Sequence, residues 1–143
     1  MDDDSKTEWR DDGVCIACGR NNPIGLRLTF EWEGDLMVST YAPRPEHQGW
    51  AGYVHGGMLA LVLDEVMAHA VNRSGYLTPT ADLQVRFRRP HPCSEPLRLT
   101  ATRPQGRRLL VCRAEARDEE GRLVAEATGK FLPYARVPEE RTR

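Results

Sequence analysis

The stretch that decides the fold is HGGMLALVLDEVMAHAVNRSG, residues 55–75. It is the only long helical pattern in a chain that otherwise consists of short strand-like segments and turns. Two glycines open it and a third closes it. Its apolar side chains recur every three or four residues, which places them on one face of a helix; they are Leu59, Val62, Leu63, Val66, Met67 and Ala70. The stretch therefore predicts one long helix that buries this face.

Six strand-like segments flank the predicted helix along the chain. Each is recognised by alternating apolar and polar residues or by turn residues at its ends. The segments are residues 26–33, 36–41, 82–88, 97–103, 108–118 and 122–134. Short turns join the first two into a hairpin and the last three into an antiparallel meander. The predicted order is β-β-α-β-β-β-β, an α+β fold. The helix must pack on the sheet, because it has no other apolar surface to bury against.

Length and composition bound the class of protein. A chain of 143 residues is expected to form one domain, which we place at residues 14–134. Residues 1–13 are expected to be a disordered acidic tail and residues 135–143 a loose tail. The net charge of −1 gives no reason to expect nucleic-acid binding. Neither a signal peptide nor a membrane-spanning run is found, so the expected location is cytoplasmic.

Two adjacent acids, Asp64 and Glu65, interrupt the apolar middle of the helix. The residues three and four positions from Asp64 are all apolar, whereas His69 lies one turn beyond Glu65. Glu65 is therefore expected to be a surface acid on a polar strip. One interpretation is that Asp64 is merely half-exposed or pairs with an arginine. The other is that it faces a ligand cavity or a second subunit and is held there for chemistry.

The start of the helix is the second candidate site. His55-Gly56-Gly57 precedes the apolar pattern, and the first turn of a helix offers free N–H groups that can polarise a carbonyl oxygen. Asp64 lies about 10 Å further along the axis, at 1.5 Å per residue. That distance is too long for both groups to act on one carbonyl, so a compact site would need Asp64 from a second copy of the chain in a twofold dimer.

These residues resemble a known family. The motif HQGWAGYVHGG (47–57), followed by Asp64, is similar to that of the hotdog-fold acyl-CoA thioesterases of the PaaI-like type (4HBT superfamily). The lead-in CIACG (15–19) with NPIGL (22–26), and the segment from Thr80 to Pro90, resemble the same family. The resemblance implies a long antiparallel sheet wrapped around the central helix. It also implies dimers joined edge to edge, often paired into homotetramers.

The resemblance further implies roles for particular residues. The thioester carbonyl would accept a hydrogen bond from the N–H of Gly57, and Asp64 of the partner chain would act as nucleophile or general base. Gln48 would position water or the carbonyl, although Gly49 stands where some relatives carry an asparagine. Thr80 would orient the nucleophile. Glu65 stays open as an alternative catalytic acid.

The implied substrate is an acyl-CoA, with CoA as part of the substrate and no separate cofactor. His55 and Gly56 would contribute to substrate binding, His55 by supporting the turn. Arg86, Arg88 and Arg89 could meet the phosphates of the nucleotide; alternatively they form an ordinary solvated sheet face. The alternative functions are a non-catalytic acyl-CoA-binding or regulatory module and, ranked last, an acyl-thioester dehydratase.

The spacing of Cys15 and Cys18 is that of a zinc knuckle, but a structural zinc site needs four ligands. No second pair of this spacing exists. His47 could supply a third ligand if the lead-in folds over the loop that carries it. The expected state is two free thiols with no metal, and zinc binding with His47 is the alternative.

Overall fold

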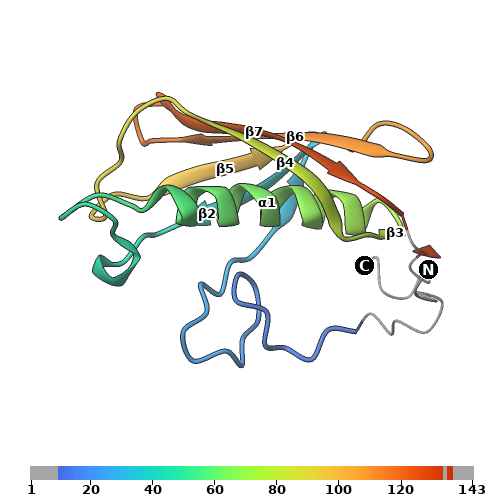
Figure 1. The fold of residues 1–143 in the computed structure, drawn as a ribbon, viewed down its shortest axis with the longest axis horizontal. Coiled ribbons are helices and arrows are strands. Elements are labelled where there is room, and N and C mark those ends of the chain that lie inside the picture. Colours follow the sequence, from blue (N-terminus) through green and yellow to red (C-terminus); the bar gives the residue numbers. More distant parts are fainter. Residues whose placement is uncertain (1–9, 134, 137–143) are drawn as a thin grey trace.

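The computed structural model describes residues 10–133 and 135–136, and shows one helix packed on one face of an antiparallel sheet (Figure 1). The expected acidic tail up to residue 9 and most of the expected C-terminal tail, residues 137–143, lie outside the described residues, as does residue 134. The helix, α1 (Gly56–Arg73), begins and ends within two residues of the predicted stretch.

The main sheet has six strands in the order β1-β2-β5-β6-β7-β4, with every neighbouring pair antiparallel. Their bounds are β1 (Glu31–Glu33), β2 (Leu36–Tyr41), β4 (Thr80–Phe87), β5 (Leu97–Ala101), β6 (Leu110–Arg117) and β7 (Leu123–Phe131). The first hairpin and the β5-β6-β7 meander are confirmed. So is the predicted order of one hairpin, one helix and four further strands.

The first strand is shorter than predicted. It begins at Glu31 because the residues before it bond to the lead-in instead of the sheet: the N–H of Leu28 donates to the carbonyl of Ala17 at 3.0 Å, and that of Leu26 to Ile16 at 2.9 Å. Leu28 is nevertheless buried, so the alternation correctly marked the inward face.

Three short elements were not predicted. Pro45–His47 form a single 3₁₀ turn, η2, and β3 (Tyr76–Leu77) pairs with β8 (Ala135–Arg136). The prediction that the loose tail starts at residue 135 is therefore wrong for these two residues. Their backbone closes a two-stranded ladder just beyond the end of α1, where Gly75 turns the chain with φ +100°.

The predicted apolar stripe of α1 is confirmed as the centre of the core. All six of its side chains are at most 4% exposed, and they pack with the inward side chains of the sheet. Close packing extends to the backbone: a Cβ built on Gly129 of β7 would stand 3.0 Å from the Met67 side chain and 2.7 Å from the Phe131 ring. Within the described residues, no helix is long and apolar enough to cross a lipid bilayer.

Strand β4 forms one edge of the sheet, and its helix-facing side chains remain exposed. Leu83 is 37% exposed and Phe87 55%, although the alternation predicted both as inward. They do face the helix side, since Leu83 pairs with Gly129, but no described residue covers them fully at the edge. Such an edge offers both unpaired backbone groups and apolar side chains to a partner.

The assignment of the core face can be tested by truncating leucines. Leu63→Ala should lower the free energy of unfolding by about 2–5 kcal/mol, because it leaves a cavity at a fully buried position. Leu36→Ala, a matched truncation at a 40% exposed position, should cost less than about 1 kcal/mol. Urea denaturation of both variants measures the difference, and equal losses would contradict the helix orientation.

Candidate active site

The start of α1 is capped by the side chain of His55. Its Nδ1 accepts a hydrogen bond of 2.8 Å from the N–H of Gly57, and its backbone carbonyl accepts from the N–H groups of Met58 and Leu59 at 2.9 and 3.2 Å. The N–H of Gly56 makes no hydrogen bond to another described residue. A helix start with one unpartnered N–H is a site for a carbonyl or anionic oxygen.

This geometry bears on the choice between the two glycines. The resemblance assigned the carbonyl to the N–H of Gly57, but that group is already bonded to His55. The free donor is on Gly56. The ring of Phe87, from β4, lies beside it: a Cβ built on Gly56 would be 3.5 Å from two ring carbons. The arrangement therefore favours Gly56 as the donor and places an exposed aromatic ring next to it.

Asp64 lies two turns further along α1 and is held by Thr80 at the start of β4. The hydroxyl of Thr80 donates to Oδ1 of Asp64 at 2.7 Å. Burial raises the pKa of the Asp64 carboxyl above its ordinary value, while the bond from Thr80 opposes that shift. The structure thus brings Asp64 and Thr80, two of the predicted site residues, into contact. The Asp64 carboxylate is half-buried and is oriented by the Thr80 hydroxyl. No arginine among the described residues forms an ion pair with it.

A register shift explains why Thr80 can reach the helix. Along β4 the odd-numbered residues face α1, so simple alternation would point Thr80 to the other side. The pairing with β7 shifts between Thr80 and Asp82, which sets Thr80 opposite the core residue Phe131. Bulges of this kind commonly re-aim a side chain next to a functional site. Alternation alone could not have predicted the result.

Glu65 faces away from Asp64 and is not a surface acid, so that prediction is wrong. Its side chain is 17% exposed and lies under the lead-in, where Oε1 is 3.1 Å from Nε2 of His69 and 3.7 Å from Sγ of Cys15. Although burial opposes ionisation, hydrogen bonds with His69 and the thiols of Cys15 and Cys18 hold the pKa of Glu65 below its ordinary value. Because the two acids point to different sides of α1, this favours Asp64 over Glu65 for chemistry at β4.

Gln48 lies in the exposed loop before the helix. Its Oε1 accepts a hydrogen bond of 3.0 Å from the N–H of Gly52, which ties the loop together. Gly49 packs against the cap, since a Cβ there would stand 3.1 Å from the ring of His55. A larger residue at position 49 would therefore push on His55, which gives a local reason for glycine. A role of Gln48 toward substrate stays a prediction.

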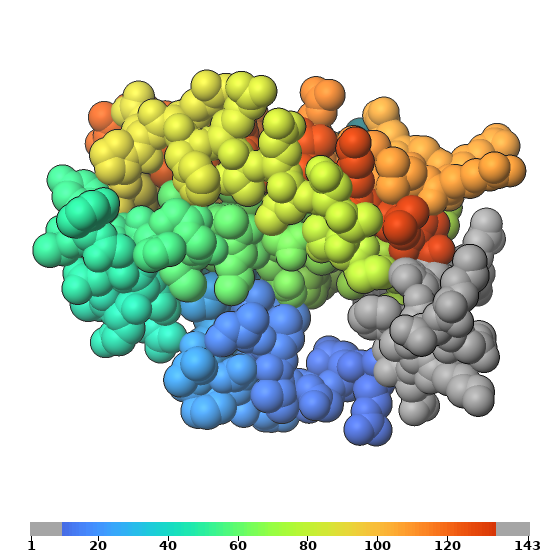
Figure 2. Space-filling view, viewed as in Figure 1, coloured from blue at the N-terminus to red at the C-terminus, as the bar shows by residue number. Residues whose placement is uncertain are grey.

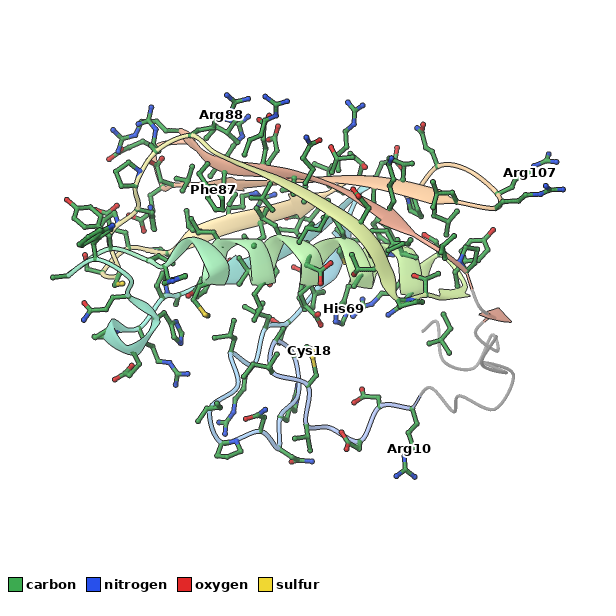
Figure 3. The ribbon with its side chains drawn as sticks, in the orientation of Figure 1. Arg10, Cys18, His69, Phe87, Arg88 and Arg107 are labelled. Carbon is green, nitrogen blue, oxygen red and sulfur yellow. The ribbon has the colours of Figure 1, made fainter. Side chains whose placement is uncertain are left out.

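The three arginines of the sequence prediction do not gather at the helix start. Arg88 pairs with Glu126 at 3.0 Å, on the side of the sheet away from α1 (Figure 3). Arg86 stands opposite Glu126 in register and lines a shallow hollow on that outer face together with Arg113. Arg89 follows at the end of the strand.

The predicted third zinc ligand is elsewhere. His47 is buried, and its Nδ1 lies 2.8 Å from the hydroxyl of Tyr41 and 3.1 Å from the N–H of Arg44. It braces the loop before α1, and its carbonyl accepts from the N–H of His55 at 2.9 Å. The proposal that His47 joins Cys15 and Cys18 is therefore wrong. Sequence spacing could not reveal that Glu65 occupies that position instead.

Comparison with known proteins identifies the family. The model of the thioesterase superfamily, 4HBT, matches residues 51–125, which include the capped helix start, Asp64 and Thr80. The chain belongs to this superfamily. A curated relative, the acyl-coenzyme A thioesterase THEM4 of Bos taurus, is 33% identical over 98 residues, which are 66% of this chain. Those residues are 40% of the bovine protein, so the chain spans less than half the length of that relative.

Solved structures confirm the hotdog fold. A thioesterase superfamily protein matches with a TM-score of 0.78 and 29% identity, over 84% of this chain and 63% of the other. The PaaI protein of E. coli, from the phenylacetic acid degradation operon, matches with a TM-score of 0.71 and 24% identity. The match covers 78% of this chain and 83% of the PaaI chain.

A third structure is that of a hypothetical thioesterase from Streptococcus pneumoniae with coenzyme A. Its TM-score is 0.72 at 21% identity, over 78% of this chain and 88% of the other. Structures of two variants of this bacterial protein also match. One replaces an aspartate with alanine, and the other replaces a threonine sixteen residues further on with alanine.

The cap at the helix start yields a stability prediction. His55→Ala should lower the free energy of unfolding by about 0.5–2 kcal/mol, because it removes the acceptor for the N–H of Gly57. His55→Asn should retain most of that stability, since asparagine is among the best residues at this position. Thermal or urea denaturation of the two variants measures this. An alanine variant as stable as the parent would rule out the capping role.

Proposed function

We propose that this chain is an acyl-CoA thioesterase that hydrolyses an acyl thioester to the free acid and CoA. The observation that carries the proposal is the half-buried Asp64 carboxylate held by Thr80 on the central helix of a thioesterase-superfamily fold. The variants of the S. pneumoniae protein support it, because the same two residue types stand at the same separation of sixteen. The curated relative supports the substrate class.

In the proposed reaction the thioester carbonyl oxygen accepts a hydrogen bond from the free N–H of Gly56, at the positive end of the α1 dipole. Asp64 then takes a proton from water, whose oxygen attacks the carbonyl carbon. Collapse of the tetrahedral intermediate breaks the carbon–sulfur bond and releases CoA, with the proton returned to the thiolate. Direct attack by the carboxylate, with hydrolysis of the resulting anhydride, is the other form of the same proposal.

The direction of β4 supports a site shared between two chains. Within one chain, Thr80 at the start of the strand lies beside Asp64, and Phe87 at its end lies beside Gly56. If the free edges of two β4 strands pair antiparallel about a twofold axis, the start of one strand faces the end of the other. Asp64 of one chain then approaches Gly56 of its partner, and two identical sites form.

The surface of the single chain is suited to this pairing. Figure 2 shows a band of α1 that is uncovered between the lead-in and β4. The exposed side chains of Leu83 and Phe87 flank it. Two surface hollows lie elsewhere among the described residues. One is on the outer face of the sheet and the other lies between residues 23–27 and the loop before α1, and neither is lined by Gly56 or Asp64. We therefore propose a homodimer, further paired as a dimer of dimers, with Arg86, Arg88 and Arg89 available to the nucleotide phosphates.

The role of the carboxylate is tested by Asp64→Asn. This variant should lose at least about 100-fold in kcat, the scale of a catalytic base, because the amide cannot accept the proton. Thiol release from a panel of acyl-CoAs of varied chain length and aromaticity measures it. Asp82→Asn, a nearby exposed acid on β4, serves as the control and should retain normal turnover.

Glu65→Gln distinguishes the two adjacent acids in the same assay. Loss of turnover in this variant while Asp64→Asn stays active would transfer the catalytic role to Glu65. If the parent protein releases thiol from none of the panel yet binds CoA esters in calorimetry, the chain is an acyl-CoA-binding module instead of an enzyme.

The role of the helix start is tested by replacing Gly56. Proline deletes the N–H, yet it suits the first position of a helix, and His55 before it already has the extended conformation that a following proline requires. Gly56→Pro should lower kcat by about 100-fold, as for loss of one donor to an oxyanion. Gly56→Ala keeps the N–H, and its Cβ makes only an ordinary contact with Phe87, so it should stay active.

Mixing the two inactive variants tests whether the site is shared. In a mixed dimer of Asp64→Asn and Gly56→Pro, one of the two shared sites has both groups intact. Refolding equal amounts together should restore about a quarter of parental turnover, because half of the dimers are mixed and each has one working site. A mixture no more active than its components would show that each chain builds its own site.

A further inference from the structure

A second cluster of reactive side chains lies on the other side of α1 from Asp64. Sγ of Cys15, Sγ of Cys18 and a carboxylate oxygen of Glu65 all lie within 4.8 Å of one another. Cys15 and Cys18 come from the lead-in, and Glu65 from the middle of the helix. In Figure 3, Cys18 lies between the lead-in and the side of α1 that carries His69.

The backbone around the two cysteines is wound into a tight loop. The N–H of Gly19 donates to the carbonyl of Cys15 at 2.9 Å, and the N–H of Cys18 points to Sγ of Cys15 at 3.5 Å. A Cβ on Gly19 would stand 2.4 Å from the backbone nitrogen of Cys15, so only glycine fits there. The loop thus holds both sulfurs on the side of the lead-in that faces Glu65.

A fourth donor is held beside these three. Nε2 of His69 is 3.1 Å from Oε1 of Glu65, and its ring is stacked on Phe30 with the centroids 3.9 Å apart. The stack fixes the plane of the ring and keeps the nitrogen turned toward Glu65. His69 is not one of the three residues whose ligand atoms lie within 4.8 Å of one another, so its ring would have to turn toward the sulfurs to supply the fourth ligand.

The groups of the cluster are of the kinds that bind a cation. Two half-buried thiols adjoin a carboxylate whose ion-pair partner among the described residues is His69. A divalent cation would offset the negative charge of both thiolates and of Glu65.

We propose that Cys15, Cys18, Glu65 and His69 bind one zinc ion. Two thiolates, an imidazole and a carboxylate are zinc ligands, and bonds of about 2.0–2.3 Å in a tetrahedron separate the ligand atoms by about 3.3–3.8 Å. The separation of 3.7 Å between Cys15 and Glu65 lies in this range, and that of 3.1 Å between Glu65 and His69 is close to it. With four protein ligands the ion would be structural, fastening the lead-in to the helix turn that also carries Asp64.

The test measures metal on the full-length protein. Purified chain should contain about one equivalent of zinc, and metal-free protein given Co²⁺ should show the thiolate-to-cobalt absorption of a tetrahedral site. Zinc should raise the melting temperature of the metal-free protein, because the ion binds only the folded state. Cys15→Ser and Glu65→Gln should each lose the cobalt absorption or shift it and should bind zinc more weakly.

Cys93→Ala is the matched control, since Cys93 is a free cysteine outside the cluster, and it should keep metal and absorption unchanged. The cobalt spectrum of the parent protein tests the proposal even if one of the variants fails to fold. Zinc below about a tenth of an equivalent after incubation with excess zinc, together with no cobalt–thiolate band, would overturn the proposal. Equal metal loss in Cys93→Ala and Cys15→Ser would overturn the assignment of the ligands.

Discussion

The structure depends on the packing of one face of α1 against the sheet. The buried stripe from Leu59 to Ala70 fixes the rotation of the helix about its axis, and every other side chain of the helix is then assigned a direction. Since consecutive residues of a helix point about 100° apart, two adjacent acids cannot share an environment. Asp64 turns toward β4, and Glu65 turns toward the lead-in.

This division gives the helix two polar sides with different chemistry. On the β4 side, a hydroxyl orients a partly desolvated carboxylate, and the strand edge beyond it is open to a second chain. On the lead-in side, a carboxylate and an imidazole meet two thiols from a distant part of the sequence. The first side suits hydrolysis and the second suits a structural ion. A metal at the second would hold the helix turn on which the first depends.

The capped start of α1 shows how local geometry selects among similar groups. Both glycines can lie close to a ligand, but the imidazole of His55 accepts from the N–H of Gly57, whereas the N–H of Gly56 has no partner among the described residues. His55 is itself placed by the buried pair of His47 and Tyr41, through the bond from its N–H to the carbonyl of His47. The loop between the first hairpin and the helix therefore acts as a support for the donor.

The sequence by itself determined the helix, its buried stripe, the hairpin, the meander and the resemblance to the thioesterase family, because periodicity and turn residues are local properties. It also indicated Asp64 as a candidate catalytic residue, from its apolar helical neighbours and from the resemblance, and Thr80 through the resemblance alone. Tertiary structure decided the rest. A register shift turned Thr80 toward the helix, the side chain of His55 accepted a hydrogen bond from the N–H of Gly57, and the path of the lead-in placed Glu65 instead of His47 beside the cysteines. These features depend on contacts between residues far apart in sequence or on the orientation of a single ring. The spacing of residues along the chain determines neither the contacts nor the ring orientation.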